Sequence, residues 1–400
     1  MSWEPPGRAA RTMFARDRKT PLAEWWWTID KQLLSALILL MAVGMMLSFA
    51  ASPPVAERLG LNHWYFIIRH AMFDIMALPV LIGVSFLSHR HARWLSLAVL
   101  VGSIVLLWLT LKLGVEVKGA KRWVSILGNT IQPSEFVKPA YAIVAAWLFS
   151  ESMQQKGVFP RIIATLIMFS IVAGLLLQPD IGQTSLMLAT WAALLFLSGI
   201  SWFLILGLMG LGVGGLFAAY YVFPHFAKRI DAFLNPEGGG NTYQVDKALN
   251  SLLEGGWFGR GPGESLAKKV IPDAHADYVF SAAAGEFGIL FCLVLVALIV
   301  FIVMRALAGA QQQSTLFARL AVATLAIQFG LQCAINLSVN LNLIPPKGMT
   351  LPFVSYGGTS TFAIAFGMGL ILALTRRRPE ESWSTGIPTY RPGTAVVPAE

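Results

Sequence analysis

Long apolar runs separated by short polar stretches follow one another along most of the chain. Several approach or exceed the roughly 20 residues that a helix needs to cross a bilayer. The pattern predicts an all-α polytopic membrane protein with one membrane domain over 32–375, between two flexible tails at 1–31 and 376–400. We expect about ten transmembrane helices, at 32–51, 65–87, 94–114, 136–150, 161–178, 183–199, 201–222, 278–306, 315–340 and 357–375.

The composition agrees with this pattern, because 56% of the 400 residues are hydrophobic and only 13% are charged. Soluble domains carry about 25% charged residues. The formal charge of +9 does not indicate a nucleic-acid-binding protein, because the basic residues are spread over tails and loops. Basic residues concentrate in short loops on the cytoplasmic side of a membrane. Both tails are therefore predicted to be cytoplasmic, with a long extracytoplasmic loop, 223–276, between spans seven and eight.

Two kinds of site are not indicated by the sequence. It contains no G-x-x-x-x-G-K-[ST] phosphate loop, so a built-in nucleotide motor is not expected. Cys292 and Cys333 lie inside apolar runs and have neither zinc-site spacing nor a disulfide framework. We interpret both as core residues.

The stretch "KVIPDAHADYVF" at 269–280 places two aspartates and a histidine before a long apolar run. Pro272 suits the start of a helix, and Asp273 is interpreted mainly as a residue that caps it. Asp277 is harder to explain by capping. Helical spacing puts Asp277 on one face with Ser281, Ala284 and Gly288, where small residues either admit a neighbouring helix or leave a cavity.

No second carboxylate is predicted to face Asp277. Glu286 lies nine positions further on, near the opposite face of the expected helix. Asp277 is therefore expected to act largely alone or with a metal ion.

Further carboxylates and cations lie near the predicted outer ends of the spans. Glu135 and Lys138 are three residues apart and are expected to pair on one helix face, while Asp180 begins another span. The outer cations are either solvated loop charges or ligands for a phosphate or pyrophosphate; they are Lys118, Lys121, Arg122 and Lys347.

Several segments, in order from the third span to the tenth, resemble the FtsW/RodA (SEDS) family of membrane peptidoglycan glycosyltransferases. They include "KGAKRW" 118–123, "IQPSEFVK" 131–138, "QPDIGQTS" 178–185, "RIDAFLNP" 229–236, "GGWFGRGPGES" 255–265, "IPDAHADYVFSAAAGEFG" 271–288 and "NLIPPKGMTLPFVSYGGTS" 342–360. The N-terminal part is most similar to the FtsW division branch.

The resemblance implies ten spans and an inverting glycosyltransferase that polymerises lipid II at the outer membrane face. It makes Asp277 the essential aspartate, either as general base or as ligand of Mg²⁺ or Mn²⁺, with no organic cofactor. The remaining candidate cavity or substrate-binding residues are Glu135, Lys138, Asp180, Lys121, Arg122, Gln132, His275, Lys347 and Ser355. The sequence departs from the family pattern at Asp273, Ala276, Tyr278 and Gly285.

The resemblance also implies partners and a location. The expected partners are lipid II, undecaprenyl-pyrophosphate-linked glycan, a class B penicillin-binding protein (an FtsI-like transpeptidase), other division proteins and membrane lipids, without nucleic acid. The expected location is the bacterial cytoplasmic (inner) membrane at the division septum. Three alternatives remain open: a RodA-like elongation polymerase, a lipid II flippase and a non-catalytic division scaffold.

Overall fold

The protein was analysed as a computed structural model, which describes residues 20–117, 120–126, 129–154, 157–222, 227, 230–231, 243–261, 275–346 and 348–376. The described residues fall into two units, one of residues 20–30 with 376 and one within residues 31–375. In the first unit, α2 (Pro21–Thr28) begins after Thr20, whose side chain accepts a hydrogen bond from the Ala23 amide. Arg376 Nε donates to Thr28 Oγ1 over 3.0 Å.

Each predicted span matches a helix of the second unit, although the one over 278–306 is divided at Gly288, and the prediction of an all-α polytopic membrane protein is confirmed. Seven helices in the described residues are long and apolar enough to cross a membrane, and α9 is a shorter apolar helix. The ten helices are α3 (Lys31–Ala51), α5 (Tyr65–Ser85), α6 (His89–Leu113), α7 (Pro133–Met153), α8 (Phe159–Leu177), α9 (Ile181–Leu197), α10 (Trp202–Val222), α13 (Val279–Gln311), α14 (Leu316–Asn340) and α15 (Gly358–Thr375).

The centre of this unit is formed by α7, α14 and α15, which pack on one another. Helix α15 also packs along α5, where a Cβ placed on Gly369 would lie only 2.8 Å from the Leu81 carbonyl oxygen. Small residues at such crossings let two helices approach closely. Helices α5, α6 and α8 instead expose many apolar side chains, as expected for helices that face lipid.

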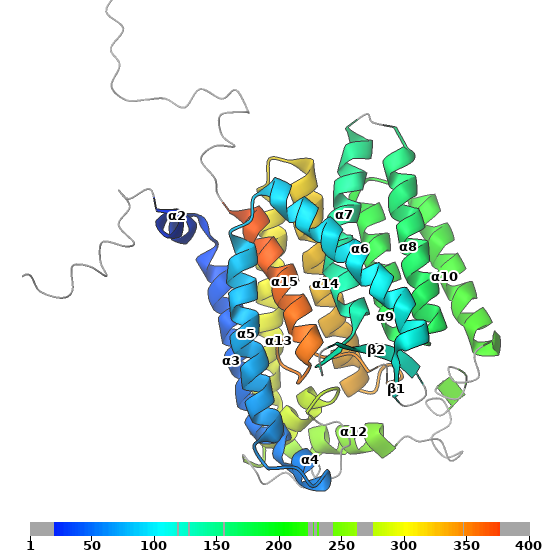
Figure 1. Ribbon diagram of the computed structural model, residues 1–400. Helices are drawn as coiled ribbons and strands as arrows, with labels where there is room; N and C mark the ends of the chain where they lie inside the picture. The colour runs from blue at the N-terminus through cyan, green and yellow to red at the C-terminus, as the bar shows by residue number, and fades with distance from the viewer. Residues whose placement is uncertain are drawn as a thin grey trace, which may run out of the picture. The chain divides into compact units, whose positions relative to one another are not determined.

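Short elements gather at one end of the helical bundle (Figure 1). They include α4 (Pro53–Arg58), α12 (Tyr243–Gly255) and a three-stranded antiparallel sheet, β1 (Val115–Val117), β2 (Ala120–Ile126) and β3 (Asn129–Ile131), in the order β1-β2-β3. The sheet was not predicted, because residues 115–135 were interpreted only as a loop. The sequence signal was present in the β-branched residues at 115, 117 and 124.

The prediction of one continuous helix over 278–306 is wrong at its start. Gly288 has φ 80° and ψ 177°, which interrupts α13. Cys292 Sγ lies 3.9 Å from the Phe280 carbonyl oxygen, whereas twelve residues of straight helix would span about 18 Å. Residues 279–287 therefore form a short helical segment that folds back toward residues 289–311. The second segment, about 34 Å long, is still sufficient for one membrane crossing.

The break in α13 is held by a loop that precedes it. The Ile289 amide donates to the Gly256 carbonyl over 2.9 Å, and the Gly261 amide donates to the Glu286 carbonyl over 3.0 Å. A Cβ on Gly288 would collide with the backbone of Gly259 and Trp257. The apolar pattern could not indicate this break, because its hydrogen-bonding partners lie about thirty positions earlier in the chain.

Candidate functional site

The first two turns of α7 carry a buried ion pair. Pro133 occupies the first helical position, and Glu135 follows in the first turn, where its charge suits the helix dipole. Lys138 Nζ lies 2.9 Å from Glu135 Oε2, and the two side chains are only 3% and 5% exposed. The predicted pairing of these residues is confirmed.

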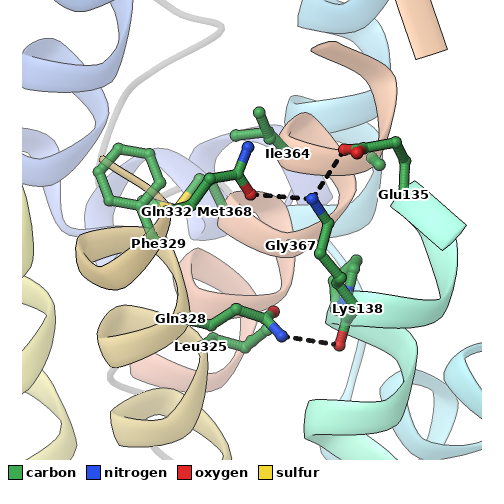
Figure 2. A pocket seen from close by; sticks show the side chains of 11 residues that line it. Glu135, Lys138, Leu325, Gln328, Phe329, Gln332, Ile364, Gly367 and Met368 are labelled. Carbon is green, nitrogen blue, oxygen red and sulfur yellow. Dashed lines mark hydrogen bonds and ion pairs between the residues drawn. The ribbon is translucent and has the colours of Figure 1, made fainter. Parts of the chain in front are cut away.

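Two glutamines complete the surroundings of this pair. Lys138 Nζ donates to Gln332 Oε1 over 2.9 Å, and Gln183 Nε2 donates to Glu135 Oε1 over 2.6 Å. Figure 2 shows the Lys138 ammonium between Glu135 and Gln332. A buried charge is tolerated when it is both paired with an opposite charge and hydrogen-bonded. Glu135 and Lys138 pair with each other, and each also has a hydrogen bond to a glutamine.

A small cavity adjoins the Glu135–Lys138 pair. Its volume is about 30 Å³, which is room for about one or two water molecules and far too little for a sugar ring. The cavity is lined from α7, α14 and α15 by Glu135, Lys138, Pro139, Leu325, Gln328, Phe329, Gln332, Ala363, Ile364, Gly367 and Met368.

Asp180 lies directly before α9 and caps it, because its Oδ1 accepts a hydrogen bond from the Gln183 amide over 3.2 Å. Arg122 of β2 holds the same turn. Its Nη2 donates to the Pro179 carbonyl over 2.6 Å, and its Nε lies 3.8 Å from Asp180 Oδ2. Burial raises the pKa of the Asp180 carboxyl, while Arg122 opposes that shift. Arg122 is thus engaged by the backbone and carboxylate of this turn.

Asp277 does not lie in the first turns of a helix, contrary to the prediction. Residues 275–278 form a turn, Tyr278 is the N-cap residue, and α13 begins at Val279. The Asp277 carbonyl accepts hydrogen bonds from Asn336 Nδ2 over 3.1 Å and from Asn340 Nδ2 over 2.9 Å. The Ser281 amide, which would bond to that carbonyl in a longer helix, donates to Asn340 Oδ1 instead. The predicted shared helix face is therefore wrong for Asp277.

The Asp277 carboxylate faces the loop between α14 and α15. A Cβ placed on Gly348 would lie 3.8 Å from Asp277 Oδ2. Lys347, the neighbouring candidate, lies outside the described residues, as do Lys118 and Asp273.

His275 and Ser355 support this turn and loop. The His275 ring is buried, with its centroid 4.4 Å from that of Phe66 and 5.3 Å from that of Tyr356. The His275 carbonyl accepts a hydrogen bond from the Tyr356 amide over 2.9 Å. Ser355 Oγ accepts one from the Leu351 amide over 2.8 Å. His275 therefore connects the Asp277 turn to the loop that precedes α15, and Ser355 holds that loop internally.

The two remaining candidates lie on β2 and directly before α7. Lys121 is half-buried on β2, one residue before Arg122. Gln132 is half-buried as the N-cap residue of α7, and its side chain makes no capping hydrogen bond.

Sequence reasoning missed a row of buried amides on α14. Its members follow one another at intervals of four residues, which places them on one helix face. We call this set the amide row; it comprises Gln328, Gln332, Asn336 and Asn340. The spacing was visible in the sequence, and polar side chains inside a span are costly enough to indicate function.

The amide row connects the ion pair on α7 with Asp277. Gln328 Nε2 donates to the Lys138 carbonyl over 3.2 Å. Gln332 accepts from Lys138 Nζ and donates to the Thr350 carbonyl over 3.2 Å. Asn336 Nδ2 donates to the carbonyls of Asp277 and of Met349, which precedes Thr350. The amide row thus contacts Lys138 at one end and the Asp277 carbonyl at the other.

Comparisons with known proteins show which family the chain resembles over most of its length. The chain is 41% identical over 376 residues to a Caulobacter vibrioides protein named "Probable peptidoglycan glycosyltransferase FtsW", covering 93% of this chain and 96% of the relative. A protein of the same name from Allochromatium vinosum is 34% identical over 389 residues, covering 93% and 97% of the two chains.

Solved structures share the fold. A chain from "Structural coordination of polymerization and crosslinking by a peptidoglycan synthase complex" matches with a TM-score of 0.74 and 26% identity, covering 87% of this chain and 97% of that one. The Thermus thermophilus rod shape determining protein RodA matches with a TM-score of 0.66 and 26% identity, covering 88% and 97%. The family model described as "Cell cycle protein" for FtsW, RodA and SpoVE matches residues 31–380. The chain therefore belongs to the FtsW/RodA/SpoVE family of cell cycle proteins.

Proposed function

We propose that this protein is an FtsW-type peptidoglycan glycosyltransferase, which polymerises lipid II into glycan strands at the outer membrane face during septal wall synthesis. The relatives from Caulobacter vibrioides and Allochromatium vinosum are each named as a probable peptidoglycan glycosyltransferase FtsW and align over nearly their whole length, which supports the proposal. The observation that carries the chemical part of the proposal is the placement of Asp277: two buried asparagines hold its main-chain carbonyl, and its carboxylate lies opposite Gly348.

Asp277 acts as the general base. The acceptor sugar hydroxyl loses its proton to the carboxylate as its oxygen bonds to the anomeric carbon of the donor glycan. The bond between that carbon and the donor pyrophosphate breaks, and undecaprenyl pyrophosphate leaves. A single displacement inverts the anomeric configuration and requires only one base.

The leaving pyrophosphate requires positive charge. Lys121 and Lys347 are the proposed side-chain sources. We assign Arg122 a different role, because its guanidinium already contacts the Pro179 carbonyl and the Asp180 carboxylate. It fixes the turn that begins α9.

A divalent ion, Mg²⁺ or Mn²⁺, is compatible with this site. No group of three or more His, Cys, Asp or Glu side chains able to hold a metal occurs among the described residues. Mg²⁺ is commonly bound by one or two carboxylates together with substrate phosphates, so Asp277 and a pyrophosphate would form a suitable ligand set. When bound, the ion would supply charge neutralisation for the leaving group.

The Glu135–Lys138 pair and Asp180 line the polar interior next to the reaction site. Glu135 and Gln332 hold the Lys138 ammonium in one position, inside a part of the bundle where the effective dielectric constant is low. This network keeps the core of the bundle rigid behind Asp277.

The proposed partner is a class B penicillin-binding protein that cross-links the new strands. The similarity to a chain of a peptidoglycan synthase complex supports this proposal. We further propose that the protein lies in the inner membrane at the septum, with 1–31 and 376–400 as cytoplasmic tails around the membrane domain 32–375. Labelling of single cysteines in each tail, from either side of the membrane, tests the orientation.

The activity is tested with purified protein, alone and with its cognate transpeptidase, on lipid II in detergent with Mg²⁺ or Mn²⁺. Glycan polymer resolved by gel electrophoresis is the expected product. Transport cannot occur in detergent, so polymer also excludes a protein that is only a flippase or only a scaffold. Failure to form polymer with the partner and metal present would contradict the proposal. Depletion in cells separates the division role, which predicts filaments, from the elongation role, which predicts rounding.

A further inference from the structure

The C-terminal end of α14 holds Asp277 by its backbone. Asn336 and Asn340 are each only 1% exposed. Asn336 Nδ2 donates to the Asp277 carbonyl over 3.1 Å, and Asn340 Nδ2 donates to the same oxygen over 2.9 Å. Two buried side chains from another helix therefore fix one carbonyl.

Asn340 also caps the start of the short helical segment that follows Asp277. Tyr278, the N-cap residue of α13, makes no side-chain capping bond. Asn340 Oδ1 instead accepts hydrogen bonds from the Ser281 amide over 3.1 Å and from Ser281 Oγ over 2.8 Å. The first amides of a helix lack partners within the helix, so this contact caps α13 from α14.

Asn336 fixes the opposite wall of the same site. Its Nδ2 also donates to the Met349 carbonyl over 2.6 Å. The neighbouring residue, Gly348, faces the Asp277 carboxylate. Asn336 thus ties both the Asp277 turn and the loop opposite its carboxylate to one point on α14.

We propose that Asn336 and Asn340 are positioning residues for the reaction, which set the direction of the Asp277 carboxylate relative to the acceptor hydroxyl. The inference rests on the proposed role of Asp277 as general base. Asparagine suits this task, because its amide supplies donors to the Asp277 carbonyl and, in Asn340, an acceptor for Ser281. Misplacement of a catalytic group by about 1 Å can lower a rate by about 100-fold.

The test compares lipid II polymerisation by Asn336→Leu and Asn340→Leu with the unmodified protein in complex with its transpeptidase. We expect kcat to fall by about 10- to 100-fold while KM for lipid II stays within about twofold. The acidic limb of the pH–kcat profile should also move, because the environment of the base has changed. Asn336→Ser and Asn340→Ser, which retain a hydroxyl, provide milder variants if the leucine variants do not fold.

Thr324→Val is the matched control. Thr324 is buried on α14, four residues before the amide row, and its hydroxyl bonds only within its own helix, to the Leu320 carbonyl over 2.7 Å. This variant should keep both kcat and the pH profile. Unchanged kcat in folded Asn336 and Asn340 variants would overturn the inference, as would a loss of kcat with an unmoved pH profile. Full activity of Asp277→Asn would instead overturn the proposed role of Asp277, so the two failures are distinguishable.

Discussion

Lys138→Met should destabilise the protein more than most single substitutions. Methionine resembles the aliphatic part of the lysine side chain but lacks the ammonium that lies 2.9 Å from Glu135 Oε2. Glu135 would keep only the hydrogen bond from Gln183 in a buried position. Removing one partner of a buried ion pair costs about 3–5 kcal/mol, because the remaining charge is uncompensated. Gln332 would also lose the donor that bonds to its Oε1.

A double-mutant cycle measures this effect. The free energy of unfolding is compared in one detergent for the unmodified protein, Lys138→Met, Glu135→Gln and the combined variant. Replacing both charges removes the unpaired carboxylate, so the combined variant should recover about 1–3 kcal/mol relative to Lys138→Met. If Lys138→Met is as stable as the unmodified protein, or if the two substitutions are additive, the interpretation of a tightly coupled buried pair is refuted.

Further predictions concern two backbone contacts near the site. Gly288→Ala should lower the melting temperature and the yield of folded protein, because the added Cβ would collide with the backbone of Gly259 and Trp257 and the residue has a positive φ. The control is Gly102→Ala in α6, which has open space around it and should leave the melting temperature unchanged. An unchanged melting temperature for Gly288→Ala as well would contradict the packing of the loop at 256–261 against the break in α13. Arg122→Gln removes the hydrogen bond from the guanidinium to the Pro179 carbonyl and should therefore lower the free energy of unfolding by about 1.5–3 kcal/mol. Thermal unfolding measures this loss, and an unchanged melting temperature would contradict the role of Arg122 in holding that turn.

The membrane helices could be predicted from the sequence because hydrophobic length alone defines a span. Nine of the ten expected runs became one helix each, the run over 278–306 is divided at Gly288, and the Glu135–Lys138 pairing followed from helical spacing. These features depend on neighbours within a few residues, so a local pattern contains the necessary information.

The errors occur where distant segments decide the local conformation. The break at Gly288 depends on the loop at 256–261, and the start of α13 depends on Asn340, some sixty residues later. The second contact removes Asp277 from the helix on which it was predicted. The amide row had a visible four-residue period, but its role became clear only when its partners on α7 and in the loop at 348–350 were known.

The role of Asp277 is tested most directly by the initial rate of lipid II polymerisation by Asp277→Asn, assayed with the transpeptidase partner present. A positioned general base contributes about 10²- to 10⁴-fold, so the rate should fall by at least about 100-fold without loss of folding or complex formation. Glu57→Gln, which alters an exposed carboxylate on α4 at the same end of the bundle, should retain the normal rate. An Asp277→Asn rate within about twofold of the unmodified protein would contradict the assignment of Asp277 as the catalytic base.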